Sequence, residues 1–281
     1  MIQKVKNLLL HVKFIRDYAR GKNVYLDPIY IKGKNLDSNP FYLLGKTILN
    51  DTHFLKVQEQ SEKERLKRPT RTDVINFLLS QIQTDSKYLE IGVRNPEDNF
   101  NLVNADKKYS VDPGIEFKSN PVDFPYTSDD FFFKLSNNEI LDSDLRFDVI
   151  FIDGLHLAEQ VDRDIKNSLR YIKDGGFIVL HDCNPPTEWH ARELYDYFHT
   201  PAQGYWNGTT WKAFMKWRFD KSVNSCCINS DWGIGVLSKN RTVGVSIEPV
   251  NSFFEFNTFS KNRKYYLNLM DFETFKTLIS N

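Results

Sequence analysis

The chain has 281 residues and a mass of 33.0 kDa, which fits one large domain or one domain with extensions. Its 41% hydrophobic and 26% charged residues are ordinary for a globular protein and exclude a disordered one. Thirty-seven basic residues balance 37 acidic ones, so no net field draws the protein to nucleic acid or to an anionic membrane. Three cysteines, of which Cys226 and Cys227 are adjacent, make no disulfide framework and favour a reducing, cytoplasmic location.

The first twenty residues predict an amphipathic helix rather than a signal peptide. Val5, Leu8, Val12 and Ile15 recur at helical spacing, and charged residues interrupt the apolar run soon after Leu10. Packing of this helix against the main domain is the simpler interpretation, and a role at a membrane surface is the alternative. No segment approaches the roughly 18 apolar residues of a membrane span.

Residues 22–70 are polar and rich in turn residues, and we expect them to be irregular. A charged run from Glu59 to Arg68 ends at Pro69, which disfavours helix in the residue before it. The boundary falls here, so residues 1–69 are predicted to be an N-terminal helical and irregular extension.

After Pro69, short runs of β-branched and aromatic residues alternate with helical patterns. A helix capped by Thr72 and Asp73 comes first. A second helix, over 157–172, lies between the strands predicted at 147–152 and 177–180. The predicted strands are 88–93, 108–113, 147–152 and 177–180. Strands that alternate with helices indicate parallel βαβ units with helices on both faces of the sheet.

Two further strands, 225–229 and 233–237, predict an antiparallel edge hairpin joined by Ser230 and Asp231. Residues 70–238 are therefore expected to form a doubly wound α/β domain, in which ligands bind at the carboxyl ends of the strands. Many aromatic residues follow in 239–281, and burial of so many rings is strongly favoured over their exposure to water. This C-terminal extension is predicted to pack on the core or on a second subunit, which would make the protein a homo-oligomer.

The first strand ends in Glu90-Ile91-Gly92. Gly92 allows a sharp turn and the approach of a ligand that would otherwise meet a Cβ atom. The next segment, 94–99, lacks the further glycines of a dinucleotide fingerprint and carries two acidic residues that would repel phosphate. This pattern argues against NAD or FAD and for an adenosine ligand without phosphate.

The second strand ends in Asp112, twenty residues after Gly92, where a carboxylate can accept both ribose hydroxyls. The alternative is that Asp112 only begins a turn with Pro113. Ser128 or Asp129 is placed to meet an adenine edge, and a helix N-cap is the alternative for this segment.

Two neighbouring strands end in acidic and imidazole side chains. Asp153 and His156 follow one strand, and His181 and Asp182 follow the next. Two carboxylates at one rim suit a divalent cation such as Mg²⁺ or Mn²⁺, and a histidine beside them suits a general base. We favour His156 over His181 as the base because His156 begins a helix and can lean over the cleft. The alternative is that these residues cap the helix and satisfy backbone groups in turns.

Together, the motifs resemble those of class I S-adenosylmethionine-dependent methyltransferases. The motifs are Leu89-Glu90-Ile91-Gly92, Val111-Asp112, Phe147–Gly154 with His156, and Gly175–Asp182. They are most similar to small-molecule O-methyltransferases related to macrocin O-methyltransferase and cephalosporin-hydroxylase-like proteins. The resemblance covers roughly residues 70–238 and implies a mostly parallel, seven-stranded Rossmann-like sheet.

The resemblance also implies ligands and roles. S-adenosylmethionine would contact Glu90 and Gly92 through its methionine part, Asp112 through the ribose, Ser128 and Asp129 through the adenine, and also Asp153. Catalysis would fall to His156, Asp153 and His181, and a cation of the Mg or Mn type would bind Asp153 and Asp182. In two places the chain departs from the family. Asn95–Asn99 replaces the glycine-rich continuation of the first motif, and His181 stands where metal-dependent relatives carry another acid.

The implied reaction is methyl transfer to a hydroxyl of a small molecule or sugar. The segment 204–212 holds aromatic residues and glycines where such enzymes place acceptor-side elements, although aromatic core packing explains it equally well. Two other functions remain open: a nicotinamide-dependent oxidoreductase on the same fold, and a non-catalytic module that binds an adenosine ligand. A nucleic-acid methyltransferase is disfavoured, because Asn184-Pro185-Pro186-Thr187 lacks the aromatic residue that would stack on a flipped base.

Overall fold

The computed structural model describes residues 43–45, 47, 51–83, 85–116, 119–195 and 200–280. The chain forms two compact units, residues 64–193 with 207–281 and residues 1–63 with 194–206, and each is described by itself. The first, called the sheet unit below, contains the β-sheet and all the predicted site residues. The amphipathic helix predicted within residues 1–20 lies outside the described residues.

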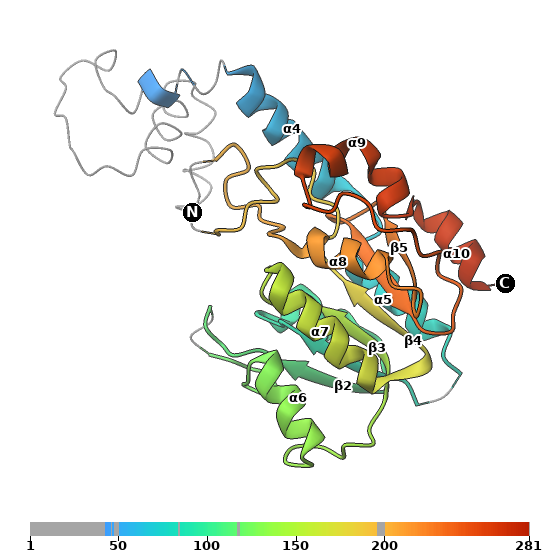
Figure 1. The fold of residues 1–281 in the computed structure, drawn as a ribbon. Helices are drawn as coiled ribbons and strands as arrows, with labels where there is room; N and C mark the ends of the chain where they lie inside the picture. The colour runs from blue at the N-terminus through green and yellow to red at the C-terminus, as the bar shows by residue number, and fades with distance from the viewer. Residues whose placement is uncertain are drawn as a thin grey trace. The chain divides into compact units, whose positions relative to one another are not determined.

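The strands of the sheet unit are β1 (Lys87–Ile91), β2 (Lys107–Val111), β3 (Phe147–Ile152), β4 (Ile172–Leu180), β5 (Asn224–Ile228), β6 (Ile234–Ser238) and β7 (Leu269–Met270). They form one seven-stranded sheet in the order β2-β1-β3-β4-β6-β5-β7 (Figure 1). Strands β1 to β4 run parallel, β6 is antiparallel to both β4 and β5, and β7 is parallel to β5. The predicted α/β sheet with an antiparallel hairpin is confirmed, but β7 lies outside the hairpin and forms the edge.

The helices of this unit include α5 (Arg71–Ser80), α6 (Ser128–Ser136), α7 (Ala158–Tyr171), α8 (Thr210–Arg218), α9 (Phe256–Tyr266) and α10 (Phe272–Ser280). One apolar core joins the sheet to α6, α7, α8 and α9, and a second joins its other face to α5 and α10. Helices therefore cover both faces of the sheet, as the alternation of strands and helices predicts (Figure 1).

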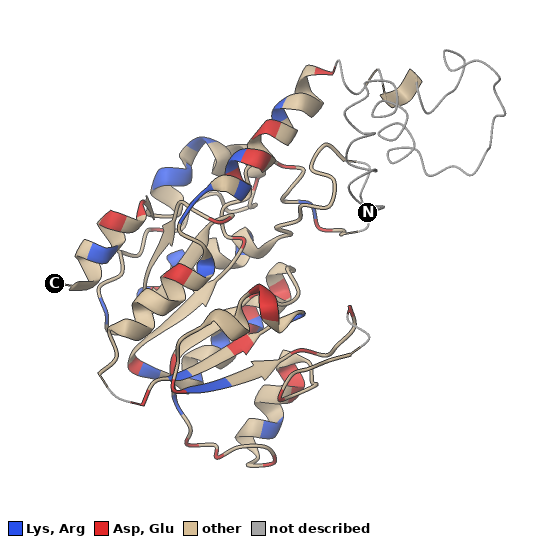
Figure 2. Ribbon diagram, turned by 180° about the vertical axis from the view of Figure 1, so that it is seen from behind, with Lys and Arg blue, Asp and Glu red and all other residues tan. Residues whose placement is uncertain are grey.

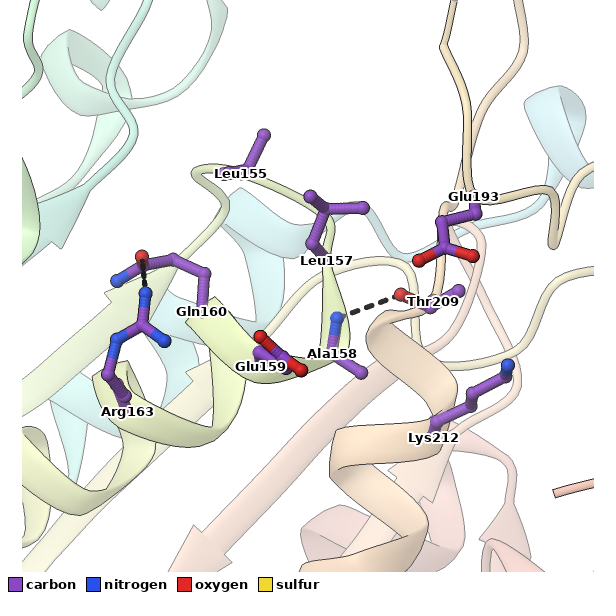
Figure 3. Close-up of a pocket in the computed structure, with 9 residues that line it drawn as sticks. All are labelled: Leu155, Leu157, Ala158, Glu159, Gln160, Arg163, Glu193, Thr209 and Lys212. Carbon is purple, nitrogen blue, oxygen red and sulfur yellow. Dashed lines mark hydrogen bonds between the residues drawn. The ribbon is translucent and has the colours of Figure 1, made fainter. Parts of the chain in front are cut away.

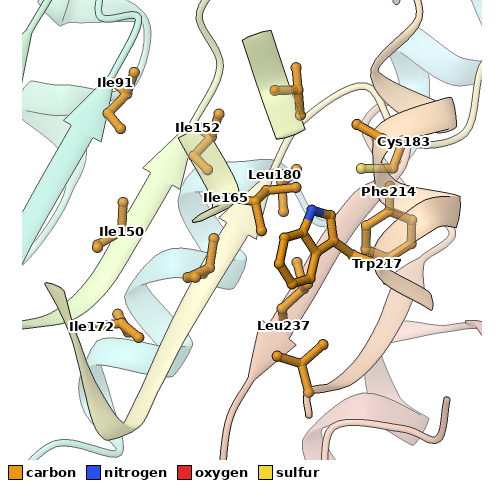
Figure 4. Packing of buried hydrophobic residues seen from close by; sticks show 14 of the residues in the cluster. Ile91, Ile150, Ile152, Ile165, Ile172, Leu180, Cys183, Phe214, Trp217 and Leu237 are labelled. Carbon is orange, nitrogen blue, oxygen red and sulfur yellow. The ribbon is translucent and has the colours of Figure 1, made fainter. Parts of the chain in front are cut away.

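Strand β3 shows why the two cores form. Its residues are all buried, and they alternate between the two sides because successive side chains of a strand point to opposite faces. Ile150 and Ile152 pack in the core with α7, and Figure 4 shows Ile152 near Leu180 and Ile165. Val149 and Phe151 belong to the opposite core. A strand buried on both faces needs a nearly continuous apolar run, and that run made β3 predictable.

Basic and acidic residues are interspersed along the described chain, consistent with a net charge of zero (Figure 2). Helix α4 (Thr52–Leu66) shows this most clearly, since lysine and glutamate residues recur along it. This helix corrects the prediction that residues 22–70 are irregular. Its sequence is rich in good helix formers but has no apolar stripe, so the periodicity that marks an amphipathic helix is missing.

Two element boundaries also differ from the predicted ones. Helix α5 is capped by Thr70, not Thr72: Thr70 Oγ1 accepts from the Asp73 amide, and the Asp73 carboxylate accepts from the Thr70 amide at 2.8 Å. Strand β4 begins directly after α7, so residues 173–176 belong to the strand, which was predicted to begin only at residue 177.

Residues after Ser238 contribute to the sheet unit rather than lying apart from it. They supply β7, α9 and α10, and Phe259 and Phe275 are fully buried in opposite cores. The guanidinium of Arg218, itself buried in α8, donates to the carbonyls of Val245 and Tyr266. The domain boundary predicted at residue 238 remains a prediction.

Candidate active site

Asp153 and the pair His181-Asp182 stand at the same edge of the sheet. Asp153 follows β3, and His181 follows the adjacent parallel strand β4, where Ile152 and Leu180 are register partners. The His181 amide still donates to the Ile152 carbonyl at 3.2 Å, which holds the two strand ends together. Parallel neighbours end at one edge of a sheet, which is why residues almost thirty positions apart meet here.

The structure brings the four predicted strand-end residues into one cluster. His181 Nδ1 lies 3.2 Å from Asp153 Oδ1 and 3.3 Å from Asp182 Oδ2. His156 Nε2 lies 3.3 Å from Asp153 Oδ1, and its Nδ1 lies 3.3 Å from Asp182 Oδ2. Each carboxylate thus bridges two imidazoles. The His156 side chain is 19% exposed and that of His181 8%, so His156 is the more accessible ring.

Two charged residues that the sequence did not single out complete the cluster. Asp231, in the turn between β5 and β6, places Oδ1 3.3 Å from His181 Nε2. Arg71, the first residue of α5, places Nε 3.8 Å from Asp153 Oδ2 and Nη1 3.4 Å from His181 Nε2. Nothing in the local sequence distinguishes them, because a turn aspartate and a helix-end arginine are common surface residues.

The charges of the cluster shift its pKa values. Burial lowers the pKa of His156, but the carboxylates of Asp182 and Asp153 outweigh burial and raise it to about 9. The same balance, with Asp231 added, raises the pKa of His181 well above its usual range. Burial raises the pKa of Asp153, but His181, His156 and Arg71 together lower it well below the usual range.

A segment from a distant part of the chain, residues 207–209, holds the cluster in place through hydrogen bonds and close backbone packing. Asn207 Nδ2 donates to Asp182 Oδ1 at 2.6 Å, and the Thr209 amide donates to the His156 carbonyl at 2.8 Å. Gly208 has φ +59°, and a Cβ atom there would lie 2.1 Å from the His156 carbonyl oxygen. These three residues belong to the predicted acceptor-side segment, yet they are buried and hold the site together. Tyr205 and Trp206 fall in the other unit.

Asp153, His181 and Asp182 are close enough together that they could hold a metal ion. One ligand atom from each lies within 4.8 Å of the others, which matches a cation held between them. Two carboxylates suit Mg²⁺ or Mn²⁺, and the imidazole also suits softer divalent ions. The predicted pair Asp153 and Asp182 is part of this set, and His181 occupies the third position. Arg71 is a competing positive charge 3.8 Å from Asp153.

The residues at the end of β1 have partners within the protein. Glu90 is 2% exposed and accepts hydrogen bonds from Tyr88 Oη at 2.6 Å and Asn99 Nδ2 at 2.8 Å. Burial raises the pKa of Glu90 to about 7, against the effect of these two hydrogen bonds. Gly92 has φ +87°, and a Cβ atom on it would lie 2.3 Å from Gly154 Cα. The absence of a side chain at Gly92 therefore lets β1 and the Asp153 loop meet.

Asp112 ends β2 beside this turn. Its carboxylate accepts hydrogen bonds from the amides of Arg94 at 2.9 Å and Gly114 at 2.7 Å. These bonds support the alternative that Asp112 begins a turn. They leave further lone pairs on both carboxylate oxygens, because a carboxylate offers about four acceptor sites.

Ser128 and Asp129 lie at the start of α6, which Thr127 caps by accepting from the Asp130 amide at 3.1 Å. Ser128 Oγ donates to Asp164 Oδ1 at 2.6 Å, and Asp129 forms an ion pair with Arg163 at 3.2 Å. Both side chains therefore bind α7. This segment therefore forms a helix N-cap, as the alternative interpretation predicts, and Thr127 is the capping residue.

A pocket of about 350 Å³ opens beside the loop that carries His156 (Figure 3). Leu155 and Leu157, which flank His156 in sequence, form its apolar part. Thr209 and Lys212 line the other side at the start of α8, and Figure 3 shows the Ala158 amide bonded to Thr209 Oγ1. Its remaining residues are Ala158, Glu159, Gln160, Arg163 and Glu193.

Among the residues that the structure describes, none of the helices has the length and apolarity needed to span a lipid bilayer. All three cysteines are buried free thiols.

Comparisons with known proteins bear on the same region. No curated protein matches the chain. Among solved structures, it is similar to a putative O-methyltransferase from Klebsiella pneumoniae, with 16% identity, a TM-score of 0.37, and coverage of 71% of this chain and 94% of that one. An O-methyltransferase from Bacillus cereus, in complex with SAH, has 14% identity and a TM-score of 0.39 over 68% and 92% of the two chains. Likeness at this level says nothing of activity.

The family match is the informative comparison. Residues 51–183 match the model of a family described as a methyltransferase domain. The matched region contains β1 to β4 and ends directly after Asp182, so it includes Asp153, His156 and His181. The small-molecule branch of the family stays a prediction. The match over residues 51–183 therefore confirms the methyltransferase family predicted from the strand-end motifs, and the enzyme class that this family implies.

Proposed function

We propose that the protein transfers a methyl group from S-adenosylmethionine to a hydroxyl oxygen of a small molecule or sugar. One observation carries the proposal: the paired aspartates and histidines that end β3 and β4 converge within 3.2–3.3 Å, inside the region that matches a methyltransferase domain. A buried cluster of titratable groups at the carboxyl edge of a parallel sheet is typical of an active site.

The edge around β1 and β2 suits an adenosine ligand that lacks phosphate. The short helix after β1, Pro96–Asp98, carries Glu97 and Asp98 in its single turn, and carboxylates at that position repel a pyrophosphate. Asp112 keeps acceptor sites for two ribose hydroxyls. Contact of the methionine part with Glu90 and Gly92 also belongs to the proposal.

The adenine position is assigned to Ser128 and Asp129. An adenine there would share or replace their bonds to Asp164 and Arg163. Backbone groups of the same loop are equally able to read an adenine edge, because each peptide offers one donor and one acceptor.

S-adenosylmethionine supplies a methyl group on a positively charged sulfur, open to direct displacement by an oxygen. The chain's part is to align donor and acceptor and to take up the hydroxyl proton. His156 is the proposed base, because it has the more accessible ring, which Asp153 and Asp182 hold through both of its nitrogens. Because these carboxylates raise the pKa of His156 to about 9, the ring accepts the hydroxyl proton only in its neutral form, and turnover should rise as the pH approaches 9. His181 and Asp153 complete the proposed catalytic set.

A divalent cation between Asp153 and Asp182 would stabilise the developing negative charge on the acceptor oxygen. His181 provides the third donor of that set.

We assign the acceptor to the pocket beside Leu155 and Leu157. Its volume of about 350 Å³ lies at the small end of the range for ligand pockets. Acidic groups (Glu159 and Glu193) and basic groups (Arg163 and Lys212) both line it, and such a mixture suits an acceptor with several hydroxyls, which donate and accept hydrogen bonds. A cytoplasmic location, which the buried thiols favour, completes the proposal.

Calorimetry with S-adenosylmethionine, its demethylated product and NAD tests the cofactor. We expect micromolar affinity for the first two, and a loss of roughly 1.5–3 kcal/mol in Asp112→Ala, the range for a hydrogen bond to a charged group. Asp123→Ala is the matched control: the Asp123 carboxylate also holds a loop against β2, through the Ser110 amide at 2.9 Å, but has no proposed ribose contact.

Three results would overturn parts of the proposal. Tighter binding of NAD would favour the oxidoreductase. Equal losses in Asp112→Ala and Asp123→Ala would mean that Asp112 acts only through its loop. Binding without methyl transfer to any hydroxyl in a broad panel of sugars and small alcohols would favour the non-catalytic module.

A further inference from the structure

His181 has a carboxylate on each side of its ring. Its Nδ1 faces Asp153 and Asp182, at 3.2 and 3.3 Å, and its Nε2 faces Asp231 at 3.3 Å. Arg71 Nη1 lies 3.4 Å from the same Nε2 and 3.6 Å from Asp231 Oδ2, so the guanidinium also pairs with the Asp231 carboxylate. The first two aspartates belong to the proposed catalytic and metal-binding set. Asp231 lies at the opposite edge of the His181 ring, beside Nε2. It therefore cannot bind the same cation or the same reacting group as Asp153 and Asp182, which lie beside Nδ1.

The turn that carries Asp231 is fastened to both neighbouring segments. Asp231 Oδ2 accepts from the Arg71 amide at 2.7 Å, which ties the turn to the start of α5. The amides of Cys183 and Asn184 donate to carbonyls of the turn at 2.9 Å, which ties it to the segment that follows His181. The Asp231 side chain is therefore held from two directions at the distance that meets Nε2.

The backbone of this turn is strained in a way that local sequence does not favour. Asp231 has φ +42° and Trp232 has φ +63°, followed by Gly233 at φ +93°. A bulky residue in the left-handed region is rare and destabilises the backbone. Strain of this kind persists where the surroundings over-determine the conformation, and it clusters at functional sites.

We propose that Asp231 is a positioning residue that fixes the His181 ring with Nδ1 directed into the gap between Asp153 and Asp182. Its Oδ1 accepts from Nε2–H, and its Oδ2 accepts from the Arg71 amide. A histidine is oriented by the hydrogen bond at its other nitrogen, and an outer carboxylate is a common partner. The expected effect of Asp231 on turnover rests on the proposed function. The expected orientation of the His181 ring does not depend on that function.

Asp231→Asn tests the assignment because it keeps the hydrogen bond from the Arg71 amide but replaces the acceptor that faces His181 Nε2 with a donor. An amide NH₂ group cannot face the Arg71 N–H, so the asparagine oxygen must take that bond. Its NH₂ group then faces His181 Nε2, which has to act as an acceptor. Asparagine also tolerates positive φ better than most residues, so the turn itself is not further strained.

We expect ¹⁵N NMR of histidine-labelled protein, with His181 assigned by substitution, to show a protonated Nε2 in the wild type. In Asp231→Asn the Nε2 signal should move to the range of an unprotonated ring nitrogen. Turnover should fall about 10–100-fold, the usual effect of losing an outer carboxylate, with little change in KM for the methyl donor.

Ser230→Ala is the matched control. Ser230 Oγ donates to the Pro69 carbonyl from the same turn, and the substitution loosens the turn without touching His181. Should Asp231→Asn not fold, Asp231→Ser asks the same question, because its shorter side chain cannot reach both partners.

An unchanged Nε2 signal in Asp231→Asn would overturn the proposal, as would the same signal shift in Ser230→Ala. The NMR measurement needs no methyl transfer. A shifted signal with no methyltransferase activity in the wild type would leave the positioning role intact and count against the proposed function alone.

Discussion

Asp164 is a buried carboxyl whose ionisation opposes folding. It is 1% exposed, and burial raises its pKa from 3.8 to about 6 against the hydrogen bonds from Ser128 and Gln160. A raised carboxyl pKa means that the folded state favours the protonated form. The stabilising contribution is therefore complete below about pH 4 and is lost as the pH rises through 6.

Asp164→Asn should remove this pH dependence, because asparagine keeps the acceptor oxygen and cannot ionise. We expect the variant to be more stable than the wild type by about 1–3 kcal/mol at pH 7.5 and equal to it at pH 4, measured by urea unfolding. Asp162→Asn, on the same helix, is the matched control. The pKa of Asp162 is lowered, since Lys166 and Lys216 outweigh its burial, so this variant should lose stability at pH 7.5. A gain in both variants would contradict the argument.

The cluster at the ends of β3 and β4 makes a second prediction, on metal dependence. If a cation bound by Asp153 and Asp182 takes part, a chelator should inhibit the wild-type enzyme, and Asp182→Ala should abolish the response to added metal. If a histidine works alone, a chelator has no effect, and His156→Ala lowers turnover by about 10²–10⁴-fold. Full activity of both His156→Ala and Asp153→Ala on the true acceptor would leave the catalytic assignment without support.

What the sequence could predict of this site follows from where each residue lies. Asp153, His156, His181 and Asp182 stand next to recognisable strands, and parallel neighbours must end at one edge, so their meeting was predictable. Arg71 and Asp231 come from a helix start and a hairpin turn. Only the packing of α5 and the hairpin against β4 brings them to His181, and no local pattern encodes that packing.

Among the elements, those with a strong local signal were predictable and those made by context were not. The buried run of β3 and the spacing of Val161 and Ile165 in α7 each encode one structure. Helix α4 has helix-forming residues without an apolar stripe. Strand β7 has two residues, too few for any periodicity, and forms only because β5 offers it a free edge.

The C-terminal residues are part of both cores of the sheet unit. Phe259 lies against Trp211, with ring centroids 4.4 Å apart, and Phe275 packs on the opposite side of the sheet near Phe77, at 6.2 Å. Both phenylalanines are fully buried. Their contribution to folding should therefore resemble that of residues in the middle of the chain, although they follow the boundary predicted at residue 238.

Phe259→Ala and Phe275→Ala should each lower the free energy of unfolding by about 3–5 kcal/mol, and the double variant should lose nearly the sum, because the sheet separates the two sites. Phe253→Ala is the matched control: its ring is 89% exposed, and the change should stay within about 0.5 kcal/mol.

Truncation after Ser238 removes both rings and two of the three carbonyls that Arg218 binds, and it leaves the buried guanidinium only the acceptors of Ser225. The combined loss reaches the roughly 5–15 kcal/mol by which whole domains are stable, so the truncated chain should not unfold cooperatively. A soluble truncated protein that melts near the full-length temperature would show instead that residues 70–238 fold without the C-terminal helices.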